Sequence, residues 1–237
     1  MSRFIKCLSY QIKKKFIGTS IFLGFYIAIC AALYLLTIFA NIASNDRSSF
    51  SSSMSFSAVI FAFVYVIADY KSKTNYLMIF GNTRKNIFLS SLSSNLVLSI
   101  LLTIISTIFT FIENTLAELL YKGGNNMNLF HAIYPESNMG MEMLYMCALF
   151  ILVTSFSTFY GALAYKIGAI FKIVFWVAFG MSLMFSPASP VLGNLLKAFF
   201  YYGTPGGILF APINFIIAAL ILYAISYAAA IRQPQVV

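Results

Sequence analysis

Long apolar stretches alternate with shorter polar segments along almost the whole chain. From these stretches we predict six membrane-spanning helices, at about residues 17–43, 54–69, 88–112, 141–165, 169–186 and 208–230. A helix needs about 20 residues to cross the roughly 30 Å of hydrocarbon in a bilayer. The spans and their connections therefore account for nearly all 237 residues. This pattern predicts an all-α integral membrane protein with one transmembrane domain, residues 1–237, and no separate soluble domain.

The N-terminal segment, residues 2–16, follows a different pattern. Apolar residues recur there at helical spacing, with basic residues between them. This alternation predicts an amphipathic helix that lies along the inner membrane surface. A basic flank that only orients the first span is the alternative. The residues expected at the membrane surface are Arg3, Lys6, Lys13, Lys14 and Lys15.

Positive charge is distributed unevenly between alternate connections. Twelve of the 15 lysine and arginine residues lie on one side of the predicted spans, and five of the six acidic residues lie on the other. Lysine and arginine are retained on the cytoplasmic side of a membrane, so both termini are predicted to be cytoplasmic. The net charge of +9 follows from this topology and does not indicate a nucleic-acid partner. Charged residues make up only 9% of the chain, far below the roughly 25% of a soluble domain.

The ionisable residues do not support catalytic chemistry. Asp69 lies at the inner end of the second span, and the single histidine, His131, lies in a predicted outer loop, residues 113–139. The three cysteines have no metal-ligand spacing, and the sequence contains no glycine-rich phosphate-binding loop. We therefore expect a protein that is not an enzyme, with no catalytic residues, metal or cofactor of its own.

The segment between the second and third spans, residues 69–88, is the most specific signal in the sequence. An apolar stretch, Tyr76–Phe80, precedes Gly81, and a Thr-Arg-Lys cluster opens the next span. Thr83 or Asn82 can cap the helix of that span, and the basic pair that follows would anchor it at the lipid phosphates. An ordinary inner loop needs neither the apolar stretch nor the glycine. We therefore predict a short helix that lies across the cytoplasmic face and docks a soluble partner.

The phrase FGNTRKNIF in this segment resembles the permease subunits of bacterial ABC-2 type transporters. The residues that carry the resemblance are Phe80, Gly81, Thr83, Arg84, Lys85 and Phe88. The architecture extends it over the whole chain, because the family has six helices with both ends inside, an amphipathic N-terminal helix and a cytoplasmic coupling segment, here residues 70–87. The family also has a re-entrant outer element before its sixth span, which fits the proline- and glycine-rich residues 187–207. The long outer loop between the third and fourth spans departs from the family pattern.

The resemblance implies how such a protein would work. A separate ABC ATPase chain would bind ATP and Mg, and a second permease, identical or a close paralogue, would complete the transporter in the bacterial plasma (inner) membrane. ATP binding would close the ATPase pair, and the coupling segments would pass that motion to the spans. The residues expected to contact the ATPase are Phe80, Gly81, Thr83, Arg84 and Lys85. Small members of the family resemble exporters of amphipathic peptides, such as phenol-soluble modulins or antimicrobial bacteriocins.

Aromatic residues and methionines are frequent in the predicted spans. The candidates for a substrate pathway are Phe56, Phe63, Phe171, Phe175, Phe179 and Met184. Aromatic faces and flexible thioethers adapt to varied apolar shapes, so such a pathway would accept amphipathic peptides, lipids or hydrophobic drugs. Lipid-facing and helix-packing bulk is the alternative for each residue. The lack of buried charge in the predicted spans argues against small ions or sugars as cargo.

A polar residue recurs at every fourth position of the third span. This polar ridge consists of Ser91, Asn95, Ser99, Thr103 and Thr107. Small and hydroxyl side chains let membrane helices approach closely and form hydrogen bonds across the contact. We therefore predict a helix-packing role for the ridge, with a substrate path as the alternative.

Two other classes of function are compatible with six spans. The substrate-binding membrane subunit of a vitamin-type importer also lacks an ATPase of its own, but it requires a compact pocket with specific polar groups and no coupling segment. A membrane enzyme of lipid metabolism requires acids or metal ligands that the spans lack. An ATP-driven exporter permease remains the preferred interpretation.

Overall fold

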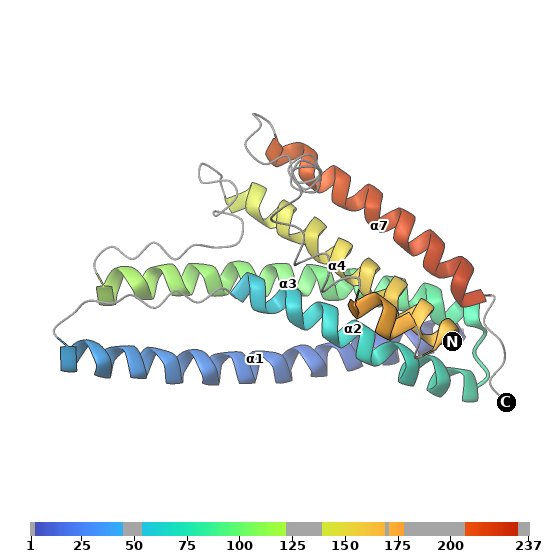
Figure 1. The fold of residues 1–237 in the computed structure, drawn as a ribbon, viewed down its shortest axis with the longest axis horizontal. Helices are drawn as coiled ribbons and strands as arrows, with labels where there is room; N and C mark the ends of the chain where they lie inside the picture. Colours follow the sequence, from blue (N-terminus) through green and yellow to red (C-terminus); the bar gives the residue numbers. More distant parts are fainter. Residues whose placement is uncertain (1–2, 45–53, 122–138, 169–170, 178–206, 232–237) are drawn as a thin grey trace.

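The computed structural model describes residues 3–44, 54–121, 139–168, 171–177 and 207–231. Every regular element in these ranges is a helix, and none is a strand, which confirms the predicted all-α class. A short helix covers residues 171–177. The long helices are α1 Arg3–Ser44, α2 Met54–Ile79, α3 Arg84–Tyr121, α4 Met139–Ile167 and α7 Gly207–Ile231 (Figure 1).

Several of these helices are long and apolar enough to cross a membrane. The five candidates, with mean hydropathy between 1.4 and 2.2, are Arg3–Leu33, Met54–Ile79, Arg84–Ile112, Met139–Ile167 and Phe210–Ile231. Large apolar side chains such as Phe25 and Leu220 are exposed on their outer faces. Apolar surface of this extent is stable in lipid and not in water. The chain is therefore a multi-pass membrane protein.

The helices form one bundle in which α4 occupies a central position. It packs against α7, α2 and α3, while α1 packs mainly against α3. Figure 1 shows α1 and α3 running in one direction and α2, α4 and α7 in the other. Ala58, Ala62 and Val66, four residues apart on α2, are buried in the main core together with Tyr145 of α4 and Phe215 of α7. Small residues on α2 allow α4 to approach it closely.

The N-terminal end of α1, the α2–α3 turn and the C-terminal end of α7 meet at one end of the bundle (Figure 1). The guanidinium of Arg3 donates a 3.2 Å hydrogen bond to the carbonyl of Gly81. The guanidinium of Arg84 donates a 3.3 Å hydrogen bond to the carbonyl of Ile231. Because the basic residues of α1, α2 and α3 gather here, we call this the basic end.

The structure differs from the prediction of a separate interfacial helix at residues 2–16, because α1 is one continuous helix of 42 residues. Its buried face carries Cys7, Gln11, Lys15 and Thr19, spaced four apart. Of the apolar side chains in this part of α1, Ile5 and Phe16 are exposed, and Phe4, Leu8 and Ile12 are half-buried. The amphipathic pattern thus arises from a polar face turned into the bundle, and it does not require the helix to lie along a membrane surface.

The coupling segment predicted at residues 70–87 is also not a separate helix. It consists of the last residues of α2, a turn, and the first residues of α3. Helix α2 continues past Asp69 because Lys73, Thr74 and Leu77 are buried on the face it shares with its neighbours. Leu77 packs there with residues of α1 and α3, and no helix breaker precedes Gly81.

Three predicted segments are described only in part. The predicted fifth span, residues 169–186, is described at 171–177, where it is helical. The predicted outer element, residues 187–207, lies outside the described residues except for Gly207, where α7 begins. The predicted outer loop, residues 113–139, is helical up to Tyr121, because α3 extends further than the expected third span.

Candidate functional site at the basic end

The turn between α2 and α3 is closed by Gly81. Its φ angle is 72°, in the left-handed region that glycine enters without a Cβ clash. The backbone N–H of Gly81 donates to the carbonyl of Met78 at 2.9 Å, and that of Asn82 donates to the carbonyl of Leu77 at 3.3 Å. These two bonds form a Schellman motif, which satisfies carbonyls at the end of α2 and stops the helix.

Thr83 caps the start of α3, one of the two capping residues that the sequence predicts. The backbone N–H of Asn86 donates to its hydroxyl oxygen at 3.3 Å, and that of Ile87 donates to its carbonyl at 3.0 Å. A cap of this kind satisfies donors that the first turn of a helix leaves free. The two helices are therefore joined by a defined turn with a fixed geometry.

Apolar side chains are exposed beside this turn. Ile79 is 81% exposed and Phe80 is 63% exposed. The ring of Tyr76 lies 4.7 Å from that of Phe80, between centroids, and stacks at 5.3 Å on Tyr10 of α1. The structure brings the predicted ATPase contacts together in one turn, with Arg84 half-buried and the others exposed. We define the turn surface as Tyr76, Ile79, Phe80, Gly81, Thr83 and Lys85.

A buried carboxylate lies deeper in the same end of the bundle. Asp69 of α2 lies 2.5 Å from the ammonium of Lys14 of α1 and 3.8 Å from that of Lys73, one turn along α2. The side chains of Asp69 and Lys73 are 5% and 3% exposed. The ammonium of Lys73 also donates a 2.6 Å hydrogen bond to the hydroxyl of Ser91 on α3. This charge cluster joins three helices.

Lys15 lies next to the charge cluster and is 2% exposed. Its ammonium has no hydrogen-bond partner among the described residues and lies 5.3 Å from the centre of the Tyr65 ring. The hydroxyl of Tyr65 donates to the carbonyl of Lys14 at 3.0 Å. Lys15 is therefore buried within the bundle and is not exposed, as a residue in contact with lipid phosphates would be. Of the other predicted surface residues, Arg3, Lys6 and Lys13 are exposed and Lys14 is half-buried.

A buried polar network connects α1 to α3 beside this cluster. The side-chain amide of Gln11 donates to the hydroxyl of Ser90 at 2.7 Å and to the sulfur of Cys7 at 3.4 Å. The hydroxyl of Ser94 donates to the side-chain oxygen of Gln11 at 3.2 Å. Hydrogen bonds of this kind hold membrane helices together where the hydrophobic effect between them is weak.

The polar ridge of α3 is buried along its whole length, which confirms its predicted packing role. The side-chain amide of Asn95 donates to the hydroxyl of Thr158 on α4 at 2.9 Å. The hydroxyls of Ser99 and Thr154 lie 3.4 Å apart, and Thr154 also lies 3.3 Å from the hydroxyl of Tyr223 on α7. The ridge therefore connects α3 to α4 and, through α4, to α7.

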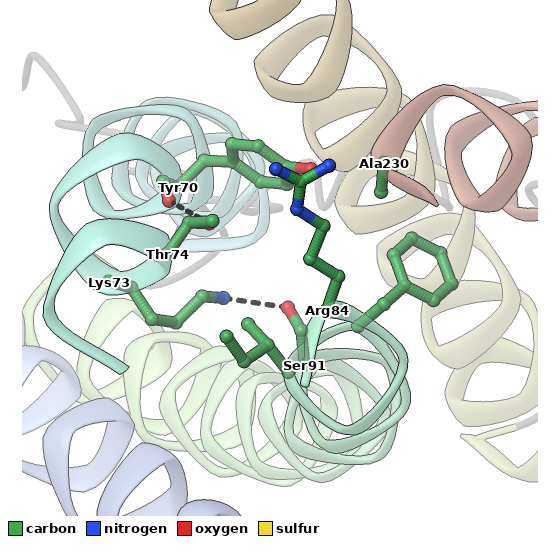
Figure 2. Close-up of a pocket in the computed structure, with 8 residues that line it drawn as sticks. Tyr70, Lys73, Thr74, Arg84, Ser91 and Ala230 are labelled. Atoms are coloured by element: carbon green, nitrogen blue, oxygen red, sulfur yellow. Dashed lines mark hydrogen bonds between the residues drawn. The ribbon is translucent and has the colours of Figure 1, made fainter. Parts of the chain in front are cut away.

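A small pocket opens between the ends of α2, α3 and α7 (Figure 2). Lys73 reaches into it from α2, and Arg84 reaches into it from the start of α3. Its polar lining is completed by Tyr70, Thr74 and Ser91. The pocket thus has two cationic side chains on different helices and hydroxyl groups near them.

A second, larger pocket is apolar and lies between α2, α4 and the helix at 171–177. Its volume is about 440 Å³, and it is lined by Val59, Ile60, Phe63, Leu152, Val153, Phe156, Phe175 and Trp176. The Phe63 and Phe156 rings stack at 6.0 Å, and Phe156 lies 6.0 Å from Phe175.

The candidate pathway residues are only partly brought together at this apolar pocket. It includes Phe63 and Phe175, and Phe171 lies 6.0 Å from Phe175. Phe56 is exposed and does not line it. Phe179 and Met184 lie outside the described residues.

Sequence reasoning missed the charge cluster and the cationic pocket. The only local signal was the spacing of Asp69 and Lys73, one helical turn apart. Among the described residues, no three histidine, cysteine or acidic side chains lie close enough to hold a metal. Comparison with protein-family models, with curated proteins and with solved structures finds no match in any of the three.

Proposed function

We propose that this chain is the membrane-spanning subunit of an ATP-driven transporter of the ABC-2 type, with a separate ATPase chain as its energy source. The observation that carries the proposal is the turn surface, where Ile79 and Phe80 are exposed next to basic residues. Adjacent exposed apolar residues at a polar end of a membrane protein are typical of a docking site for a soluble partner. By the distribution of basic residues, this end faces the cytoplasm.

The contacts of the turn suit it to transmit motion. Arg3 ties its Gly81 carbonyl to the start of α1, and Arg84 ties it to the end of α7. Behind the turn, the ion pairs of Asp69 connect α2 to α1. A partner that displaces the turn would therefore displace the ends of α1 and α7 together with α2 and α3, which is the function of a coupling segment in such a transporter.

The apolar pocket supports a hydrophobic or amphipathic cargo. Its lining residues are all apolar or aromatic, and a pocket of about 440 Å³ is of the size that binds small ligands or part of a larger one. We propose export of amphipathic peptides across a bacterial plasma membrane, by a pair of permeases that are identical or closely related. Export of lipids or hydrophobic drugs is the nearest alternative, and such cargo would use the same apolar pocket.

Purification from native membranes tests the class of protein. The tagged 26.4 kDa chain should co-purify with an ATPase that contains a Walker motif. In the reconstituted complex, Gly81→Pro and Arg84→Glu should separate ATP hydrolysis from peptide transport, because the first removes the N–H donated to Met78 and the second reverses charge at the turn. Unchanged coupling in both variants would contradict the role of the turn.

Lys71→Glu is the matched control for Arg84→Glu. It makes the same change of charge on an exposed residue of α2 that lies away from the α2–α3 turn. Both variants should insert into the membrane in normal amounts. Transport lost in Arg84→Glu but kept in Lys71→Glu assigns the effect to the turn and not to net charge at the basic end.

A second candidate is the substrate-binding membrane subunit of an importer. The observation that favours it is the absence of a separate helix between α2 and α3, since α2 leads into α3 through a tight turn. That class requires a polar, specific pocket, whereas the large pocket of this chain is apolar. Tight binding of one small polar molecule by the purified chain alone would favour this candidate.

A further inference from the structure

Positive charge exceeds negative charge among the buried groups at the basic end. Asp69 is the only carboxylate, within the described ranges, that forms an ion pair with Lys14, Lys15 or Lys73. Lys73 and Lys15 are both buried, and the Lys15 ammonium has no hydrogen-bond partner there. A buried charge is stable only when an opposite charge or several hydrogen bonds compensate it. Lys14 is partly exposed to water, so among the described residues one carboxylate faces two buried lysines, and an anion beside Lys73 would compensate the remaining positive charge.

The small pocket is the place where such an anion can reach Lys73, the one residue of the charge cluster that lines it. Figure 2 shows the ammonium of Lys73 and the guanidinium of Arg84 entering it from different helices. Ser91 accepts a hydrogen bond from Lys73 and keeps its own hydroxyl hydrogen to donate. The pocket therefore offers two cations and a neutral donor. Ile87 and Phe88 form an apolar wall, which strengthens electrostatic attraction by excluding water.

The size of the pocket limits what can enter. About 20 Å³ of it is open to the centre of a water-sized sphere, and one water needs about 10–15 Å³ by this measure. The pocket therefore has room for one or two oxygens of a small anionic group that reaches in from outside, but not for a sugar or a peptide side chain with its backbone. Lysine and arginine together bind phosphate oxygens well, through a point charge and a planar array of donors.

We propose that this pocket binds the oxygens of an anionic phosphate group, with Lys73 and Arg84 as its cationic contacts. The group comes either from the head of an anionic lipid or from free phosphate. When bound, it neutralises the surplus charge next to Asp69 and joins α2 to α3 and α7 at the basic end. This binding is independent of the proposed transport function, because it needs neither an ATPase nor a cargo.

Binding is tested on the purified full chain in nanodiscs of zwitterionic phosphatidylcholine. One arm adds inorganic phosphate, with sodium acetate and sodium chloride at equal ionic strength as controls. The other arm replaces part of the lipid with phosphatidic acid. Thermal unfolding reports stabilisation by the ligand, and native mass spectrometry counts bound phosphate or lipid. We expect one phosphate group per chain and a higher unfolding midpoint in at least one arm.

Variants locate the binding at the pocket. Lys73→Gln and Arg84→Gln should each raise the dissociation constant for phosphate about tenfold, which corresponds to the loss of roughly one charged contact. Lys71→Gln, on an exposed residue of the same helix, should leave binding unchanged. Arg84 is half-buried, so Arg84→Gln remains informative if Lys73→Gln reduces the yield of folded protein.

If inorganic phosphate stabilises the protein, the free anion is sufficient for binding. If only phosphatidic acid stabilises it, the phosphate group comes from the lipid head. Each of these results supports the proposal. It is overturned if neither arm stabilises the protein, if acetate stabilises it as much as phosphate does, or if Arg84→Gln binds like the unchanged chain. If no Walker-motif ATPase co-purifies with the chain while phosphate binding is normal, that result would contradict the transport proposal alone.

Discussion

The carboxylate of Asp69 accepts a 2.5 Å hydrogen bond from the ammonium of Lys14, although 55 residues separate them in the chain. The two residues lie on α2 and α1, which share few other contacts. The same carboxylate lies 3.8 Å from the ammonium of Lys73. Asp69 thus fixes how α1 lies against α2 and compensates part of the positive charge that both helices bring to the basic end.

Asp69→Asn should destabilise the folded chain by about 3 kcal/mol, the lower part of the range for breaking a buried ion pair. The lower value is expected because the side chain of Lys14 is 38% exposed and can reach water. The change preserves side-chain shape but leaves Lys73 buried without a carboxylate. Thermal unfolding of the purified chain in detergent measures the effect.

A double-mutant cycle with Lys14→Gln provides the control for this prediction. If Lys14 and Asp69 interact directly, the double variant should lose less stability than the sum of the two single variants. Strictly additive losses would show that the two side chains stabilise the fold independently, and the ion pair would then have no measurable role.

Gly161→Ala should lower stability by about 1–3 kcal/mol through overpacking. A Cβ at Gly161 of α4 would lie 2.8 Å from Cγ and 2.9 Å from Cβ of Tyr70 on α2. These atoms are close to the backbone of Tyr70, so they move only if α2 moves. Gly24→Ala is the control, since a Cβ there meets no atom within 4 Å and alanine favours a helix. Equal stability of the two variants would contradict the close approach of α2 to α4.

Asn95→Ala should lower the free energy of unfolding by about 1 kcal/mol, which is the measured scale of hydrogen bonds between membrane helices. Its amide donates to Thr158, and both side chains are buried between α3 and α4. Ser93→Ala is the comparison, because the Ser93 hydroxyl donates to the Leu89 carbonyl within its own helix. Chemical unfolding in mixed detergent should give Asn95→Ala a lower free energy of unfolding than Ser93→Ala. The reverse order would contradict the packing role of the polar ridge.

Gly81→Ala should destabilise the α2–α3 turn by about 1–2 kcal/mol, because its φ of 72° strains a residue that has a Cβ. A Cβ at this position meets no atom within 4 Å, so the loss comes from the backbone and not from crowding. Gly81→Asn should lower the stability of the fold by less than Gly81→Ala, since asparagine tolerates left-handed angles better than alanine does. Equal losses for alanine and asparagine, measured by thermal unfolding, would show that the turn does not need this angle.

The sequence predicts those features that repeat locally. The ridge from Ser91 to Thr107 could be identified because every member is one helical turn from the next, and membrane helices that pack closely carry such residues. Thr83 could be identified as a cap because it directly precedes a long apolar helix. The all-α class followed from apolar stretches of membrane-spanning length.

The features that depend on distant contacts could not be predicted. Lys14 and Lys15 look like the basic flank of a first span, and only the packing of α1 against α2 and α3 pairs Lys14 with Asp69 and buries Lys15. The polar face of α1 looked like the solvent side of an interfacial helix for the same reason. In a membrane protein the polar face of a helix can be the inner one, so amphipathic spacing alone does not tell which side faces the bundle.

Photo-cross-linking at Phe80 tests the central claim most directly. A photoreactive phenylalanine analogue would replace Phe80 at the turn surface or, as the control, Phe111, which is also exposed but lies far along α3 from the basic end. After irradiation of native membranes, we expect an adduct with a Walker-motif ATPase from position 80 and none from position 111. Absence of that ATPase from the position-80 adducts, or equal adducts at both positions, would contradict the account.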